Sequence, residues 1–155
     1  MFTYTQTKNN FIKANVNEPK EILLQNVYVP FGINKNYTIK FQFSKQNEFL
    51  ASELTNIDKE HCKYLHEIYF KTDMSVQHIY KVQKKSSYLS TILCTIPQIK
   101  KQIQTIVKSS RKELNTVFTL QHKKVDIKIK NSYVWINTDK KIISPCWIVT
   151  HIKVL

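Results

Sequence analysis

The amino-acid sequence predicts a β-rich α+β fold, for two reasons. Ile, Val, Tyr, Phe and Thr, which favour strands, are frequent, and several segments alternate apolar and polar side chains with the period of a half-buried strand. Two other segments have apolar residues at helical spacing. The chain has 155 residues, 42% of them hydrophobic, and its composition does not change along its length. We therefore expect a single domain over residues 1–155.

The first third of the chain predicts strands. Residues 1–19 are polar and predict an N-terminal arm or an edge strand. A first strand is expected over residues 20–29, followed by a turn in which Gly32, the only glycine, supplies an unusual backbone angle. Residues 37–43 alternate without interruption, and we expect their aromatic side chains to face the core.

Helical spacing of apolar residues over 56–70 predicts a helical insertion, with Asn56 as its N-cap. The segment contains His61, Cys62 and His66, but their spacing matches no known metal site, so we expect neither a metal nor a cofactor. Residues 75–83 alternate again and predict a third strand. The short apolar run over residues 88–94 fits either a strand or a buried helix.

A second helix is predicted over residues 96–112. Thr95 and Gln98 have the spacing of a capping box, and proline is acceptable in the first helical turn. Behind them one apolar stripe is expected, with basic residues on the remaining face. The stripe consists of Ile99, Ile103, Ile106 and Val107.

Residues 115–155 predict the C-terminal strands. In 124–130 every second side chain is apolar and β-branched, and the others are three lysines and one aspartate. We expect separate antiparallel strands at 115–121, 124–130 and 133–136, with a last strand over 147–155. The segment 115–136 would then form the closing hairpin of the domain.

The charge of the chain suggests the class of its partner. There are 24 Lys and Arg residues against 11 Asp and Glu, a net charge of +13. A gene rich in A and T explains lysine in place of arginine but not the deficit of acids, so a polyanion is expected, with nucleic acid favoured over an acidic protein or simple solubility. No apolar run of membrane-spanning length and no signal peptide is present, which argues against a membrane partner. Cys62, Cys94 and Cys146 lie far apart, as expected for buried thiols in a reducing intracellular compartment, the cytoplasm or nucleus.

Single-stranded nucleic acid, DNA or RNA, fits this chain best, because lysines neutralise phosphates and exposed rings stack on bases with little sequence preference. The alternative for the aromatic residues is that they fill the core. The candidate binding residues are Lys40, Lys81, Lys124, Lys128, Lys130, Tyr133, Trp135 and Trp147.

The predicted order from residue 20 to residue 136 is strand, strand, helical insertion, strand, helix, strand, strand. Without the insertion this order resembles the OB-fold, and with the charge and the lysine-rich composition it resembles the single-stranded DNA-binding proteins of viruses or virus-like linear plasmids. The resemblance implies an antiparallel β-barrel with two helices that binds oligonucleotides across its second and third strands, and a role in DNA replication.

Two other functions remain as alternatives. The chain would serve as a small basic subunit of a replication, transcription or virion complex if Phe31, Tyr69 and Phe70 lay at an interface. Asp126 and Lys128 have the spacing of half of a metal-dependent nuclease site, with Glu113 as a second ligand. We expect no enzyme, because no catalytic motif of high specificity is present.

Overall fold

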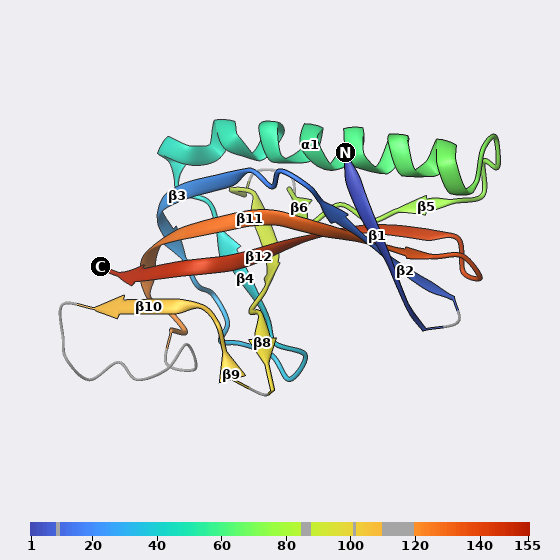
Figure 1. Cartoon of the computed structure of the whole chain (residues 1–155). Helices are drawn as coiled ribbons and strands as arrows, with labels where there is room; N and C mark the ends of the chain where they lie inside the picture. Colours follow the sequence, from blue (N-terminus) through green and yellow to red (C-terminus); the bar gives the residue numbers. More distant parts are fainter. Residues whose placement is uncertain (9, 85–87, 101, 110–119) are drawn as a thin grey trace.

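The computed structural model describes residues 1–155 except 9, 85–87, 101 and 110–119. Its described part consists of strands and one long helix, α1, which lies along one side of the strands (Figure 1). The β-rich α+β class is therefore confirmed. The elements are β1 (Phe2–Lys8), β2 (Phe11–Val16), β3 (Glu21–Tyr28), β4 (Thr38–Gln42), a 3-10 turn (Lys45–Asn47), α1 (Glu48–Tyr69), β5 (Gln77–His78), β6 (Val82–Gln83), β7 (Thr91–Thr95), β8 (Gln98–Ile99), β9 (Gln102–Ile103), β10 (Ile106–Ser109), β11 (Lys124–Asn137) and β12 (Ile142–Val154).

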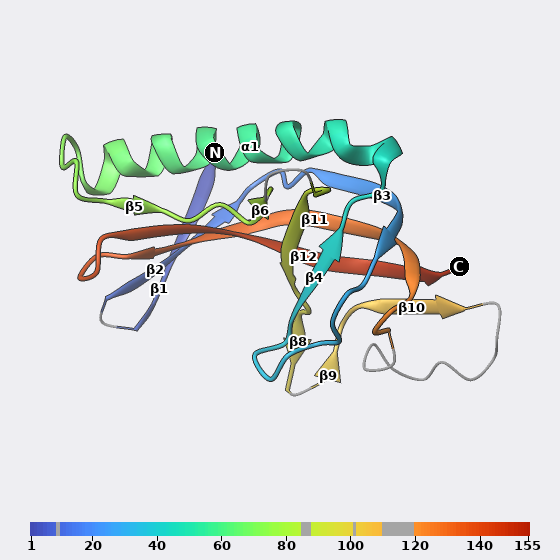
Figure 2. The ribbon, with the colours of Figure 1, turned by 180° about the vertical axis from the view of Figure 1, so that it is seen from behind.

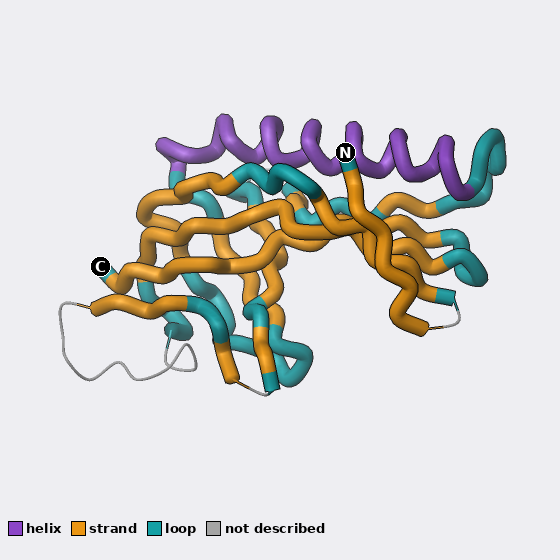
Figure 3. The backbone as a smooth tube through the Cα atoms, viewed as in Figure 1, coloured by secondary structure: helices purple, strands orange, loops and turns teal. Residues whose placement is uncertain are grey.

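Five strands form a closed circuit of pairings. The order is β3, β4, β7, β12 and β11, and β11 pairs in turn with β3. Most neighbours are antiparallel, but β7 runs parallel to β12 where Thr95 faces Ile148. Figure 2 shows β4 and β7 side by side, and Figure 3 traces the two longest strands, β11 and β12, which pair with each other. Beyond the circuit, β2 extends the sheet from β11, and β10 extends it from β12.

The apolar faces of these strands pack into two clusters. The larger lies within the circuit and beneath the first half of α1, and includes Phe41, Leu54, Ile127 and Trp147. The smaller lies beneath the second half of α1. It contains Phe2, Ala14, Cys62, Leu65, Val134, Ile136 and Ile143. Because α1, β11 and β12 contribute to both clusters, the N-terminal strands and the circuit share one scaffold.

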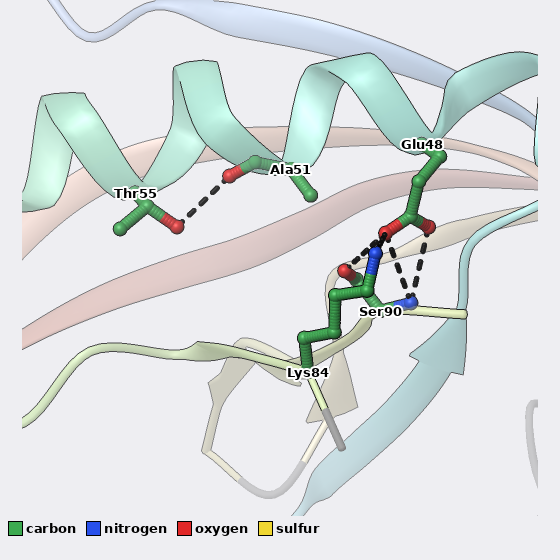
Figure 4. A network of polar contacts seen from close by, with 5 residues as sticks. All are labelled: Glu48, Ala51, Thr55, Lys84 and Ser90. Atoms are coloured by element: carbon green, nitrogen blue, oxygen red, sulfur yellow. Dashed lines mark hydrogen bonds and ion pairs between the residues drawn. The ribbon is translucent and has the colours of Figure 1, made fainter. Parts of the chain in front are cut away.

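The helix α1 begins at Glu48, so the predicted start at Asn56 is wrong although the helix itself is confirmed. Ser90 fixes this end of the helix: its backbone N–H donates to Glu48 Oε2 at 3.0 Å, and Lys84 Nζ lies 3.4 Å from Glu48 Oε1 (Figure 4). Burial opposes the charge of Glu48, but the bonds from Ser90 and the charge of Lys84 hold the pKa of this carboxyl below its usual value. The helix is thus anchored to the segment that leads into β7.

The second predicted helix is wrong over its described part. The segments Gln98–Ile99 and Gln102–Ile103 pair as β8 and β9, Lys100 between them has the left-handed conformation (φ 50°), and β10 follows. Isoleucine and valine favour strands over helices because of their branched Cβ. Val107 faces Ile152 in a parallel pairing with β12, and this long-range contact overrides the helical spacing.

Residues 124–137 form one strand rather than two, so the predicted connection at Asn131-Ser132 does not exist. The pairing with β12 instead shifts in register between Lys130 and Tyr133. Residues 124–137 pair with β12 through the turn at 138–141, which corrects the predicted closing hairpin of 115–136. The predicted strand over 115–121 lies almost wholly outside the described residues.

Turn conformations and the N-terminal segment also differ from expectation. Gly32 does not have a positive φ, whereas six residues with side chains do among those that the structure describes. They are Asn26, Tyr37, Lys71, Lys100, His122 and Lys141. The polar N-terminus is a hairpin, β1–β2, whose second strand pairs with β11. Thr138 N–H donates to Asn10 O at 3.0 Å, and Asn10 Nδ2 donates to Asp139, so the tips of the two hairpins are joined.

Candidate nucleic-acid interface

The register shift in β11 brings charged and aromatic side chains to one face. Ile127 and Ile129 point into the core before the shift, and Val134 and Ile136 do so after it. The intervening side chains face away from both apolar clusters. This outer face therefore carries Lys124, Asp126, Lys128 and Lys130 from one half of the strand and Tyr133 and Trp135 from the other.

A groove of about 590 Å³ opens beside this face, and we call it the Tyr133 groove. Its charged residues are Lys13 from β2 and Lys130 from β11. Ile148 and Thr95 line it at the point where β12 meets β7, and Tyr37 and Pro97 also line it. Apolar and aromatic side chains with a lysine on each of two strands suit a ligand that has flat bases and a charged backbone.

Three rings and one lysine form a cluster at the edge of this groove, which we call the aromatic corner: Phe11, Lys13, Tyr133 and Trp135. The ring centroids of Tyr133 and Trp135 are 5.6 Å apart with planes at 83°, and those of Phe11 and Trp135 are 6.1 Å apart at 90°. Lys13 Nζ lies 4.2 Å from the Tyr133 centroid and 5.8 Å from that of Trp135. Edge-to-face rings and a cation over their faces are mutually stabilising.

Lys13 and Phe11 were not among the predicted site residues. They alternate with Ile12 and Ala14, which pack in the second cluster, so Phe11 and Lys13 point to the outer face. When the strand that pairs with it is unknown, a polar segment with such a short alternation is easily taken for an N-terminal arm. Only the pairing with β11, where Lys13 faces Trp135, assigns these side chains to the aromatic corner.

Tyr133 is positioned by its pairing with β12. It pairs with Cys146, whose Sγ donates to Thr95 Oγ1 at 3.3 Å. Burial raises the pKa of the Tyr133 phenol well above its usual value, and the neighbouring Cys146 raises it further. The ring therefore stays neutral at physiological pH and presents an uncharged surface between two lysines.

A second groove of about 320 Å³, the Lys40 groove, lies at the other end of β4 and β7. Lys40 projects between the buried side chains of Ile39 and Phe41, away from the core. Phe31 and Tyr88 are 62% and 70% exposed and line the same groove, so two large rings stand beside one lysine. Phe31 and Tyr88 were not predicted as site residues, because neither lies in an alternating segment.

The outer face of β4 and β7 connects the two grooves. Gln42 and Thr91, which line the Lys40 groove, face each other across β4 and β7, and Thr38 and Thr95 form the pair at the opposite end. Thr95 lines the Tyr133 groove. Between them Lys40 faces Leu93, and all these side chains lie on the side opposite Ile39, Phe41, Ile92 and Cys94 of the core. A chain lying along this face therefore passes from one groove to the other.

Lys128 and the lysines near it form a basic patch on the same sheet. Lys128 faces His151 of β12, and His151 faces Ile106 of β10. In the next row Asp126 faces Lys153, which faces Lys108. These residues line a depression of about 180 Å³ in which lysines outnumber the one carboxylate. The patch therefore attracts anions.

Asp126 has a structural partner. Its Oδ1 accepts a hydrogen bond of 2.8 Å from the backbone N–H of Asn26, which has the left-handed conformation at the register shift between β3 and β11. The predicted second nuclease ligand, Glu113, lies outside the described residues. Among the residues that the structure describes, no group of three or more His, Cys, Asp or Glu side chains is placed to hold a metal ion. The carboxylate of Asp126 thus stabilises the bulge in β3.

We expect Asp126→Ala to lower the free energy of unfolding by about 1–3 kcal/mol, because the partly buried N–H of Asn26 loses its acceptor. The measurement is urea denaturation of the variant beside Glu53→Ala, which removes an exposed carboxylate from α1. A Mg²⁺-dependent cleavage of nucleic acid by the wild-type protein that Asp126→Ala abolishes, with stability unchanged, would contradict this structural role.

Two predicted site residues do not belong to the outer face. Trp147 is fully buried, and its Nε1 donates to Asp58 Oδ1 at 3.0 Å, so the prediction that it stacks on bases is wrong. The register of β12 changes near Thr150, and the shift places Trp147 on the core side, opposite His151. Lys81 lies close enough to Asp58 that its charge lowers the pKa of that carboxyl. Lys81 thus has a buried carboxylate as its neighbour, beneath α1.

The burial of side chains bears on the predictions for the cysteines and for the proposed protein interface. The three cysteines are buried and unpaired, as predicted, and burial raises the pKa of Cys62 to about 12. Tyr69 and Phe70 are partly buried and pack against the second cluster, whereas Phe31 is exposed. Two of the three residues proposed for a protein interface therefore contribute to the packing of the fold, and the interface itself stays a prediction. No helix in the described part of the chain is long and apolar enough to cross a membrane.

The chain was compared with known proteins by sequence and by structure. No protein family and no curated protein matches the sequence. The fold is similar to that of gp2.5, described as a single-stranded DNA binding protein encoded by bacteriophage T7, with a TM-score of 0.54 and 12% sequence identity. The similarity covers 88% of this chain and 86% of that chain. The two proteins therefore share a fold, at an identity too low to relate individual residues.

Proposed function

We propose that the protein binds single-stranded nucleic acid on the outer face of β4, β7, β12 and β11. One observation supports this most directly: the Lys40 groove and the Tyr133 groove lie at the two ends of one strand face, and each combines lysine with exposed or half-buried rings. The circuit β3–β4–β7–β12–β11 has the pairing order of an OB-like barrel, in which β4 and β7 are the second and third strands. The shared fold with a single-stranded DNA binding protein adds to this proposal.

The charges and rings have distinct roles in the proposal. Lys40, Lys130, Lys128 and Lys124 contact phosphates and release counterions, which supplies most of the affinity and makes it fall with salt. Phe31, Tyr88 and Tyr133 stack on bases, which requires bases that are unpaired. Since every base offers a flat face, this mode of binding has little sequence preference. The preference for single strands over duplex comes from the rings, and the salt dependence comes from the lysines.

Lys40→Ala and Lys130→Ala are expected to weaken binding to a fluorescently labelled oligonucleotide and to reduce the slope of log K against log salt by about 0.7 per lysine. The measurement is fluorescence anisotropy over a series of salt concentrations, with single-stranded and duplex DNA and RNA of one sequence. Lys63→Ala is the matched control, because Lys63 is an exposed lysine of α1, away from both grooves.

Three results would overturn the proposal: no binding to single strands at low salt, tighter binding to duplex than to single strands, or equal effects of the control and the two site variants. Circular dichroism of each variant separates a loss of binding from a loss of fold.

A further inference from the structure

Half of the aromatic corner lies outside the five-strand circuit. Phe11 and Lys13 belong to β2, which pairs with β11 only along residues 133–137, beyond the register shift. The Tyr133 groove is lined by Lys13 of β2 but not by Phe11 or Trp135. Phe11 lies two residues before Lys13 on the same face of β2, about 7 Å farther along the strand. A ligand confined to the grooves therefore reaches Lys13 but does not reach Phe11.

We propose that the N-terminal hairpin adds a separate stacking subsite, formed by Phe11, Lys13 and Trp135, which single-stranded nucleic acid reaches only when it extends beyond the Tyr133 groove. This inference rests on the proposed function. Three observations support it. The rings of the corner have edge-to-face geometry, Lys13 and Tyr133 belong to both the corner and the Tyr133 groove, and Lys13 places a positive charge where the two meet.

The corner is held in place before any ligand binds. The Asn10 backbone and side chain are bonded to Thr138 and Asp139, and these bonds join the tip of the N-terminal hairpin to that of β11–β12. On the inner side Ala14 is fully buried against the second cluster. Phe11 remains 39% exposed on this fixed support. A ring whose position is already fixed loses little entropy when a base stacks on it.

Lys13 has two possible partners in this arrangement. Without a ligand its Nζ lies over the faces of Tyr133 and Trp135, the surfaces on which a base would stack. When a base takes that place, the flexible lysine side chain turns toward the phosphate that enters with it. The cation is thus retained near the rings in both states, and the exchange of a ring for a phosphate adds one salt-sensitive contact.

The test compares three phenylalanine-to-alanine variants on a short oligonucleotide of about 5 nucleotides and a long one of about 15, within the usual range for one OB-type domain. Phe11→Ala is expected to weaken binding of the long oligonucleotide about tenfold and to leave the short one unchanged. Phe31→Ala, in the Lys40 groove, should weaken both. Phe49→Ala should affect neither, because Phe49 is an exposed ring of α1.

Tryptophan fluorescence gives a second readout. The chain has two tryptophans, and Trp147 is fully buried, so quenching by bound bases reports Trp135. Quenching is expected with the long oligonucleotide and not with the short one, and Trp135→Phe should abolish it.

Each outcome has a distinct meaning. Equal losses for both lengths in Phe11→Ala would make the corner part of the primary site, and no loss for either would make it a purely structural cluster; both results overturn the separate subsite. If the wild-type protein bound neither length at low salt, the proposed function itself would fail. Circular dichroism must show that Phe11→Ala is folded in the first two cases.

Discussion

Trp147→Ala is expected to lower the free energy of unfolding by about 3–5 kcal/mol, the range for removing a large aromatic side chain from a packed core. The indole is fully buried among residues of the larger cluster, between the strands of the circuit and α1. Its loss leaves a cavity and also removes the hydrogen bond donor of Asp58. Urea denaturation followed by far-UV circular dichroism measures the change.

Two further variants separate the contribution of the buried ring from that of the hydrogen bond to Asp58. Trp147→Phe keeps an aromatic ring in the core and removes the N–H, and we expect a smaller loss of about 1–3 kcal/mol because Asp58 Oδ1 loses this hydrogen bond. Trp135→Ala truncates the other tryptophan, which lies half-buried on the outer face, and should cost about 1 kcal/mol. A greater loss of stability in Trp135→Ala than in Trp147→Ala would contradict the positions of the two rings.

The second large effect concerns pH and the buried carboxyl of Asp58. Burial raises the pKa of Asp58 from its ordinary 3.8 to about 6, against the opposing effects of the Trp147 hydrogen bond and of Lys81. Between these two pH values the folded protein keeps a proton that the unfolded chain has released. Stability therefore falls as the pH rises from about 4 to about 6, by on the order of 3 kcal/mol, and the loss persists above pH 6.

Asp58→Asn should remove this pH dependence. The amide has nearly the same shape, and its Oδ1 can still accept from Trp147, but it has no charge to desolvate. We expect the variant to be more stable than the wild type at pH 7 and close to it at pH 4, measured by urea denaturation at a series of pH values. Glu67→Gln is the matched control, an exposed acid of the same helix. A difference between wild type and Asp58→Asn that does not change with pH would disprove the raised pKa.

Local pattern was sufficient to predict the strands whose two faces differ in polarity. The alternation in 37–43 and 124–130 matches β4 and the first half of β11, because one face of each packs in the core and the other meets solvent. The helix within 48–69 was predicted because its apolar residues recur at helical spacing. Its start was missed because Asn56 resembles a cap, while contacts with Ser90 extend the helix to Glu48.

The predictions from sequence fail where contacts between distant residues determine the secondary structure or the register. The isoleucines over 99–107 have helical spacing, but Ile99 and Ile103 belong to the paired strands β8 and β9, and Ile106 pairs with β12. Register shifts near Thr150 and after Lys130 reverse which side chains face the core, and alternation alone cannot show them. These shifts placed Trp147 inside and kept Tyr133 and Trp135 with the lysines. The contribution of Lys13 depends on the pairing of β2 with β11, which no local pattern indicates.

The pairing of β11 also determines when the protein can complete its fold. β11 lies near the C-terminus, yet its partners β2 and β3 lie near the N-terminus, and the bond from Asn26 to Asp126 spans 100 positions. Contacts of such long range form slowly because a large loop must close first. During synthesis at the ribosome, β2 and β3 emerge early and keep unpaired edges until residues 124–137 appear. Nascent chains of intermediate length are therefore the forms of this protein most exposed to aggregation.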